Sequence, residues 1–280
     1  MPGPHFPIEQ AQAKVDHAMN AKTRENLNAL NAEFYAANLE SFDATRDHPW
    51  PGWQRALEGG PRGRPGHALQ VLDIGCGNGR FAHFLCENWG SSPLDLPGLD
   101  YLGVDQSRGL LDLARERTPR DPSLWTLTWR ECDILTPSPG SALTSGPFDL
   151  VTAFGLLHHI PGLEQRKQLM REMAERARVG GRLVFTAWRF AETDRFERHL
   201  VNWDDHNAKS AIPIDLDELE AGDHLLSFGS KEGPPRYCHH CDNSEFEELV
   251  AATGMELVAT YFADSRSGDL NRYAVLEKRD

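Results

Sequence analysis

The feature that most constrains this chain is the segment LQVLDIGCGNGRF at residues 69–81. An apolar run from Leu69 to Ile74 ends at three closely spaced glycines, and the FAHFLCENW that follows has the apolar spacing of a helix. Glycines at a strand-to-helix turn let the backbone adopt positive φ and approach a ligand closely, and the helix N-terminus adds partial positive charge. The segment therefore predicts a strand, a tight turn and a helix that bind a nucleotide-like ligand.

The spacing of the glycines excludes two common nucleotide sites. A dinucleotide-binding turn has the pattern G-x-G-x-x-G, but counted from Gly75 and Gly77 the sixth position is Arg80. A phosphate-binding P-loop ends in G-K-[ST], and no lysine follows these glycines. The pattern D-x-G-x-G-x-G, from Asp73 to Gly79, instead resembles the first motif of class I S-adenosylmethionine-dependent methyltransferases. A plain glycine-rich turn is the alternative.

Two further strands end in acidic residues where that family binds its cofactor. LDYLGVDQS at residues 99–107 reads as a strand ending at Asp105, and the resemblance implies that this acid binds the ribose hydroxyls. WTLTWRECDIL reads as a strand leading to Asp133, where relatives hold the adenine; taken alone, Asp133 would be read as a loop-capping aspartate. By this resemblance, the residues expected to bind S-adenosyl-L-methionine are Asp73, Gly75, Cys76, Gly77, Gly79, Asp105, Gln106, Asp133, Ile134, Ala153 and Phe154.

Strands and helices alternate through the rest of the chain. FDLVTAFGLLHHI (148–160) is nearly all apolar, as a strand buried on both faces should be, and the charged helix after it is expected to close at Gly180 and Gly181, before a strand at 182–188. GMELVATYFA and LNRYAVLEKR predict a terminal hairpin. We predict an α/β fold: a Rossmann-like, seven-stranded, mostly parallel sheet with helices on both faces and an N-terminal helical extension.

The same reading divides the chain into functional parts. Residues 1–66 are expected to form the N-terminal helical extension and linker on the substrate side. Residues 67–280 are expected to form the methyltransferase domain, with residues 191–240 as a substrate-side insertion. The basic residues of the charged helix, Arg166, Lys167, Arg171, Arg176 and Arg178, fit a solvated helix face better than an RNA contact.

The stretch FDATRDHPWPGW at residues 42–53 is too polar for a core strand and too interrupted by proline for a helix. With the basic linker after it, LLHHI, VGGRLVFTAW and PPRYCHHCDNSEFEELVAATGMELV, it resembles the eukaryotic-type methyltransferases that esterify carboxymethyl groups on tRNA wobble uridines. The resemblance covers residues 30–280. Cys238 stands where relatives usually have an aromatic residue, and residues 191–235 are longer and more acidic than the family pattern, which leaves the acceptor open.

The chemistry implied by this resemblance needs positioning groups rather than a base. A carboxylate with a pKa near 4 is already a nucleophile at neutral pH, and a water-poor pocket that aligns it with a sulfonium methyl group supplies most of the catalysis. The candidate substrate-binding and catalytic residues are Arg46, His158, His159 and Arg236. Alternatively, Arg46 pairs with Asp43 or Asp47.

The cysteines and histidines do not predict a metal site. The motif CHHC at residues 238–241 supplies half of a structural zinc site, but Cys76 and Cys132 belong to the expected cofactor loops. We therefore expect no metal. Five cysteines form no disulfide framework and suit a reducing compartment, so a cytoplasmic location is expected.

Charge and hydropathy limit the partners. The net charge of −13 opposes binding to a polyanion, but the acidic excess lies mostly after residue 190. No segment has the roughly 18 apolar residues of a membrane span, so no membrane partner is expected. The resemblance implies a tRNA anticodon loop as partner and a small activator subunit as a further one; a small-molecule acceptor is the alternative. Three functions remain: an RNA methyltransferase, a methyltransferase for a small carboxylate, phenol or amine, and a non-catalytic S-adenosylmethionine-binding module.

Overall fold

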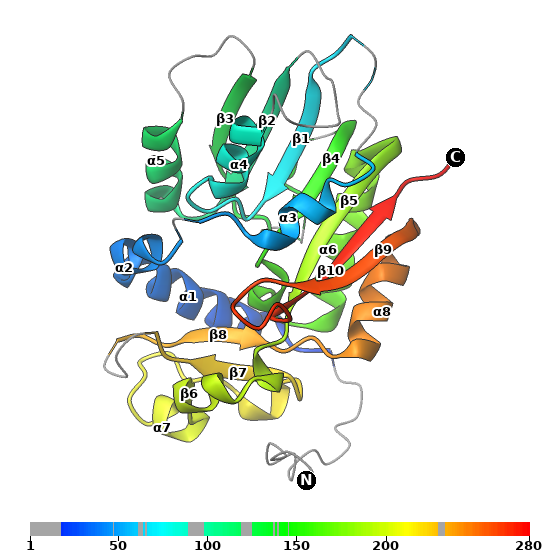
Figure 1. The fold of residues 1–280 in the computed structure, drawn as a ribbon. Helices are drawn as coiled ribbons and strands as arrows, with labels where there is room; N and C mark the ends of the chain where they lie inside the picture. Colours follow the sequence, from blue (N-terminus) through cyan, green and yellow to red (C-terminus); the bar gives the residue numbers. More distant parts are fainter. Residues whose placement is uncertain are drawn as a thin grey trace.

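The computed structural model describes residues 18–46, 48–60, 64, 66–88, 98–118, 125–136, 138, 140–144, 146–228 and 233–280. Several predictions fall on other residues: Asp47 as a partner of Arg46, Trp89 at the end of a helix, and part of the linker at residues 61–63 and 65. Figure 1 shows a large twisted sheet with helices on both sides and a smaller sheet at one end. No helix among the described residues is long and apolar enough to cross a membrane.

The large sheet has seven strands in the order β3-β2-β1-β4-β5-β10-β9. Along this order, β3, β2, β1, β4 and β5 pair in parallel, and β10 runs antiparallel to both of its neighbours, β5 and β9. This order confirms the predicted Rossmann-like sheet and its terminal hairpin. The strands are β1 Leu69–Ile74, β2 Leu99–Asp105, β3 Trp125–Glu131, β4 Phe148–Ala153, β5 Ala177–Trp188, β9 Glu256–Ala263 and β10 Asn271–Glu277.

Helices cover both faces of this sheet, because each helix has one apolar side to bury. One core includes Leu169, Met173 and Phe246 from α6 and α8, and the core of the other face includes Trp53 and Phe81 from α3 and α4. The N-terminal helices confirm the predicted helical extension. The helices are α1 Ala21–Ala37, α2 Leu39–Ala44, α3 Pro51–Ala56, α4 Arg80–Asn88, α5 Arg108–Arg117, α6 Leu163–Arg176, α7 Trp203–Asn207 and α8 Asn243–Ala252.

A second, three-stranded antiparallel sheet consists of β6 Leu200–Val201, β7 Asp223–Leu226 and β8 Arg236–His239. Helix α1 lies between the two sheets (Figure 1) and buries Leu27 and Leu30 against Tyr237 of β8. The extension and this small sheet therefore pack as one layer beside the large sheet. The short 3-10 helices are η2 Leu157–His159, η3 Phe190–Glu192, η4 Asp194–His199 and η5 Leu216–Glu218.

The prediction that two glycines close helix α6 is wrong. The helix ends at Arg176, and Gly180 and Gly181 lie inside β5. Gly180 has φ +72° beside a register shift between β4 and β5, and a Cβ on Gly181 would lie 2.9 Å from the Arg178 carbonyl oxygen. The glycines serve an irregular strand pairing, which a local helix pattern does not reveal.

The prediction that residues 42–53 are too interrupted for helix is also wrong. Helix α2 ends at Ala44, and α3 begins at Pro51. Proline is tolerated at the first helical position because its missing N–H has no partner there in any case.

Candidate active site

A cavity of about 1420 Å³ lies at the carboxyl ends of β1, β2 and β4, where ligands bind in open α/β sheets. The loops after these strands form one wall, and α1 to α3 with residues 226–228 and 236 form the other. Among the described residues that line the cavity, five are arginines and three are aspartates, with no lysine or glutamate. A chain of net charge −13 thus surrounds its cavity with an excess of positive charge.

The glycine loop after β1 has the backbone that the sequence predicted. Gly75, Gly77 and Gly79 have φ of +72°, +54° and +79°, a region that side chains other than glycine rarely adopt. Gly75 and Gly77 line the cavity. Gly79 does not; a Cβ there would lie 2.7 Å from the Trp129 ring, so this glycine permits close packing of the helix on the sheet.

Asp73 is buried beneath the loop. Its carboxylate accepts hydrogen bonds from the Tyr101 hydroxyl at 2.5 Å and the Thr152 hydroxyl at 2.6 Å. Burial raises the pKa of Asp73 to about 6, although these two hydrogen bonds oppose the shift. The residue ties β1 to β2 and β4 at the edge of the cavity.

Asp105 lies at the end of β2, and both of its carboxylate oxygens face backbone donors. Gly77 N–H donates to Oδ2 at 2.9 Å, and Ser107 N–H donates to Oδ1 at 2.8 Å. Burial raises the pKa of this carboxyl group, and the backbone hydrogen bonds oppose the shift. Each oxygen retains acceptor capacity, as a pair of ribose hydroxyls would require.

The remaining residues expected at the cofactor lie in two kinds of place. Cys76, Gln106, Ile134 and Phe154 line the cavity. Ala153 is fully buried in β4 and does not line it. Asp133 also lies off the lining, and its carboxylate accepts from Leu135 N–H at 2.9 Å and the Thr136 hydroxyl at 2.7 Å, the loop-capping arrangement.

These residues fit S-adenosyl-L-methionine. The loop at Gly75 and Gly77 leaves no side chain between the backbone and the cavity, and a Cβ on Gly75 would lie 3.0 Å from Leu156. Asp105 would supply the acceptor pair for vicinal hydroxyls, and the Cys132 and Ile134 side chains would supply an apolar border for a purine ring.

Arg46 and Arg236 both line the cavity and share an aromatic wall. Arg46 Cζ is 3.7 Å from the Phe42 ring centroid and 5.9 Å from that of Phe228. Arg236 Cζ is 5.1 Å from the Trp188 ring and 6.0 Å from that of Phe228. Neither arginine forms an ion pair with any described residue. The two positive charges therefore border the cavity without a counterion from the described part of the chain.

Burial and mutual repulsion act on this pair. Burial, together with the charge of Arg236, lowers the pKa of Arg46 to about 10. Arg236 is 7% exposed, and its Nε has no hydrogen-bond partner among the described residues. A buried guanidinium is stabilised by a hydrogen-bonded anion, so this arrangement favours an anionic ligand. The alternative partner Asp43 pairs with Arg117 instead.

His158 and His159 also border the cavity, both in neutral form. The Tyr35 hydroxyl lies 2.8 Å from His159 Nε2, and His159 Nδ1 lies 3.0 Å from the Tyr237 carbonyl oxygen. Burial and then the charge of Arg236 lower the pKa of His159 to about 3. Burial also holds the pKa of His158 well below the usual value, and its Nδ1 has no partner among the described residues. Neutral His159 therefore donates to Tyr237 and accepts from Tyr35.

Sequence reasoning did not single out Tyr35 or Phe228 as site residues. Tyr35 has the i, i+3/i+4 spacing of the cavity-facing side of α1, with Asn28, Asn31 and Ala32, so helical periodicity carried a usable signal. Phe228 follows β7, and no local pattern there indicates that its side chain faces the cavity. Its position depends on how the small sheet packs against α1.

The two cysteines of CHHC lie in different apolar clusters. Cys238 packs with Trp188 and Phe190, and Cys241 packs in the main core with Phe246. His158, His159 and Cys238 do bring ligand-type atoms within 4.8 Å of one another. Arg46 and Arg236 place positive charge beside that group, as their effect on the histidine pKa values shows, which disfavours a cation there.

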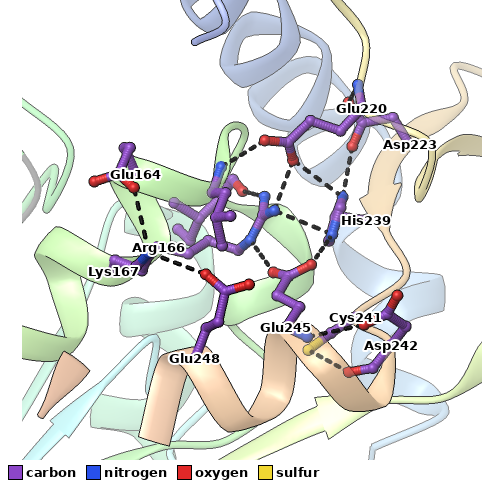
Figure 2. Close-up of polar contacts among 12 residues, drawn as sticks. Glu164, Arg166, Lys167, Glu220, Asp223, His239, Cys241, Asp242, Glu245 and Glu248 are labelled. Atoms are coloured by element: carbon purple, nitrogen blue, oxygen red, sulfur yellow. Dashed lines mark hydrogen bonds and ion pairs between the residues drawn. The ribbon is translucent and has the colours of Figure 1, made fainter. Parts of the chain in front are cut away.

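Arg166 is buried at 1% exposure, so the prediction that it lies on a solvated helix face is wrong. Figure 2 shows its guanidinium between two carboxylates: Nε donates to Glu245 at 2.5 Å, and Nη2 donates to Glu220 at 2.6 Å. His239 lies between Asp223 at 2.7 Å and Glu245 at 2.6 Å. We call these five residues the buried charge network. It ties α6 and α8 of the large domain to the small sheet beside the cavity.

Asp264, on the loop between β9 and β10, binds the start of α3 in the N-terminal extension. Its carboxylate accepts from Gly52 N–H at 3.0 Å, from Asn271 Nδ2 at 2.8 Å and from the Tyr273 hydroxyl at 2.7 Å. Trp50 stacks on Trp53, whose ring packs against Phe81 of α4. The tryptophans thus hold the extension against the loop that lines the cavity.

Comparisons with known proteins agree with this geometry. Residues 72–183 match the family model described as a methyltransferase domain. The chain is 29% identical over 156 residues to "tRNA (carboxymethyluridine(34)-5-O)-methyltransferase ALKBH8" from Mus musculus, which covers 56% of this chain and 19% of that protein. It is 26% identical over 147 residues to the "tRNA (carboxymethyluridine(34)-5-O)-methyltransferase" of Saccharomyces cerevisiae, covering 52% of this chain and 43% of that one. The chain therefore spans less than half the length of both relatives.

A solved structure shows the same fold. An S-adenosylmethionine-dependent methyltransferase from Methanosarcina mazei superposes with a TM-score of 0.57 at 16% identity, over 82% of this chain and 98% of that one. This likeness shows the fold, and the match to the methyltransferase domain, with the relatives named above, identifies the reaction class and its methyl donor. The chain is an S-adenosyl-L-methionine-dependent methyltransferase of Rossmann-like fold that resembles the tRNA carboxymethyluridine methyltransferases.

Proposed function

We propose that this enzyme esterifies the carboxylate of a carboxymethyl group on a tRNA wobble uridine. The observation that carries the proposal is the pair Arg46 and Arg236, two guanidinium groups without a carboxylate partner among the described residues, in the cavity that holds the glycine loop. The sequence similarity to the mouse and yeast proteins supports the same acceptor.

For the cofactor, we assign the roles from the geometry of the loop. The backbone at Gly75 and Gly77 would lie against the methionine part, Asp105 would accept from the ribose hydroxyls, and Ile134 would contact the adenine ring. Asp133 would contribute its backbone rather than its carboxylate, which already caps its own loop. When bound, S-adenosyl-L-methionine supplies an electrophilic methyl group.

The protein's own residues then have to hold and align the acid. Arg46 and Arg236 would each donate to a carboxylate oxygen, and two charge-assisted hydrogen bonds fix both the position and the ionised form of the acid. His159 stays neutral between Tyr35 and Tyr237, so it would position the wall of the pocket rather than accept a proton. The aromatic rings around the arginines exclude water, which strengthens the alignment.

A tRNA partner is compatible with the acidic chain because the positive charge is local. Arg108 and Arg266 are exposed at the cavity and form no ion pair with a described residue. An unstacked base from a single-stranded loop could enter the cavity and stack on an aromatic ring, while exposed arginines meet flanking phosphates. Whether a small activator subunit takes part stays a prediction.

The test uses purified protein, a methyl-labelled donor and tRNA from cells that lack this enzyme. We expect label to enter the tRNA and to be released as methanol by mild alkali, because an ester hydrolyses and a methyl group on a ring atom or ribose does not. Ribonuclease treatment of the tRNA before assay should abolish incorporation into polymer. Labelling of small acids, phenols or amines but not of tRNA would replace the RNA function with a metabolite function.

A further inference from the structure

Among the described residues, Asn31 of α1 is the one with two buried side-chain polar atoms that lack a hydrogen-bond partner. It is 2% exposed, and neither its Nδ2 nor its Oδ1 has a hydrogen-bond partner among the described residues. Leaving a buried amide unpaired is costly, and nearly all buried polar groups in native proteins are paired. Asn31 also lines the cavity. An unpaired donor and acceptor beside a ligand cavity indicate that the ligand is the partner.

Its position on α1 relates it to the proposed acid site. Phe34 lies three residues further along α1, and Arg236 Cζ lies 5.3 Å from the Phe34 ring. Residues three apart on a helix are neighbours, about 5–6 Å between Cβ atoms. Asn31 therefore lies about one helical turn from Phe34, which contacts the proposed carboxylate-binding Arg236.

The chemistry of a carboxamide is specific. Its oxygen accepts and its nitrogen donates side by side, so it matches a partner that also presents one donor next to one acceptor. Uracil presents this pattern at N3–H and C4=O, and its C5 substituent is attached next to C4. A uridine whose C5 carboxymethyl group meets the arginines would thus present its N3–H and C4=O edge close to the same wall of the cavity.

We propose that Asn31 binds the N3–H and C4=O edge of the acceptor uracil, with Oδ1 accepting from N3–H and Nδ2 donating to O4. The inference rests on the proposed function, because it assumes a uridine acceptor. It adds a base-recognition residue to the acid-binding arginines. An acid without this edge would be methylated poorly even if it fitted the arginines.

The proposal separates stability from activity. Replacing Asn31 by Leu removes two unpaired buried polar atoms and adds apolar contact, so the variant should unfold at a higher temperature than the parent protein. The same change should lower kcat/KM for the uridine acceptor by about tenfold or more, the usual range for a bidentate base contact. Asn26→Leu is the matched control, since Asn26 lies on the same helix, donates to the Pro213 carbonyl oxygen and does not line the cavity.

The experiment measures methylation of two anticodon stem-loop RNAs, one with 5-carboxymethyluridine at the wobble position and one with the same base methylated at N3. Parent protein, Asn31→Leu and Asn26→Leu are compared, together with Asn31→Ala in case the larger side chain does not fit. We expect the N3-methyl group and the Asn31 variants each to lower kcat/KM, and the two losses together to be smaller than their product, because both remove the same contact.

The outcomes are distinct. If an Asn31 variant lowers kcat/KM by the same factor on both RNAs, the base contact is overturned and the proposed function is left intact. A variant that loses stability and keeps full kcat/KM would also overturn it, because Asn31 would then be structural. If the parent protein methylates neither RNA, the proposed function fails first, and the base contact fails with it.

Discussion

Arg166 on α6 donates to Glu245 on α8 at 2.5 Å, and both side chains are largely withdrawn from solvent, with 1% and 13% of their side-chain surface exposed. The second carboxylate on this arginine, from Glu220, belongs to the segment that leads into the small sheet. One buried cation thus joins the methyltransferase sheet to the layer that forms the far wall of the cavity.

Replacing Arg166 by Met should strongly destabilise the fold. The change leaves Glu220 and Glu245 without their cation, and removing one partner of a buried ion pair costs about 3–5 kcal/mol. Urea unfolding followed by tryptophan fluorescence measures the effect. Arg171→Met is the control, because Arg171 lies on the same helix with 45% of its side chain exposed and should change stability by less than about 1 kcal/mol. Similar effects of the two substitutions would contradict the role of the network.

The ionisation of His239 should make the stability of the fold depend on pH. Burial and the nearby Arg166 lower its pKa, but hydrogen bonds to Asp223 and Glu245 outweigh them, so the pKa in the folded protein lies above the unfolded value of 6.5. The stabilisation is therefore complete below about pH 6.5 and is lost as the pH rises through the higher folded-state pKa. Thermal melting of the protein and of His239→Gln between pH 5 and 9 tests this. The difference in melting temperature between them should shrink as the pH rises; a constant difference would mean that His239 is neutral in the fold.

Arg46→Ala should lower turnover and leave cofactor binding nearly unchanged. The Arg46 guanidinium lies on the aromatic wall with Phe42 and Phe228. The residue contacts the glycine loop through its backbone carbonyl, which accepts from Asn78 Nδ2 at 3.3 Å and is retained in the alanine variant. Loss of a charge-assisted hydrogen bond to the acid is worth about 1.5–3 kcal/mol, which corresponds to roughly tenfold to a hundredfold in kcat/KM. Calorimetric titration with S-adenosyl-L-methionine and steady-state assays should separate the two effects. Arg55→Ala, which removes an arginine that contacts Tyr261, serves as the control. Equal losses of affinity and turnover in Arg46→Ala would make the residue structural.

Asp105→Ala should weaken S-adenosyl-L-methionine binding by about 1.5–3 kcal/mol, because it removes the charged acceptor pair proposed for the ribose. Its carboxylate also accepts from Gly77 and Ser107, so circular dichroism and melting temperature must first show that the variant is folded. Unchanged affinity by calorimetry in a folded variant would remove the ribose from this position. Asp133→Ala should have a smaller effect on affinity, since that carboxylate is engaged within its own loop.

The sequence by itself predicted the seven-stranded fold and the backbone of the glycine loop. Glycines at positions 75, 77 and 79 after an apolar run indicate a strand and a left-handed turn, and Asp105 is the last residue of the next strand. These signals are local: backbone conformation and strand periodicity depend on residues a few positions apart, so reading along the chain recovers them. The same local reasoning failed at Gly180, because this glycine lies in β5 beside an irregular pairing with β4 and does not end helix α6.

Only the tertiary structure decided which charges are paired and which residues form the wall of the cavity around the two arginines. Arg166 has the spacing of a surface helix residue, yet it is buried. Its carboxylate partners lie 54 and 79 positions away in the chain. Arg46, Phe228 and Arg236 come from three separate elements, and their shared wall exists because the small sheet and the N-terminal helices pack in one layer. Charge pairing and desolvation act through space, and the sequence alone does not say which charges the fold will leave without a partner.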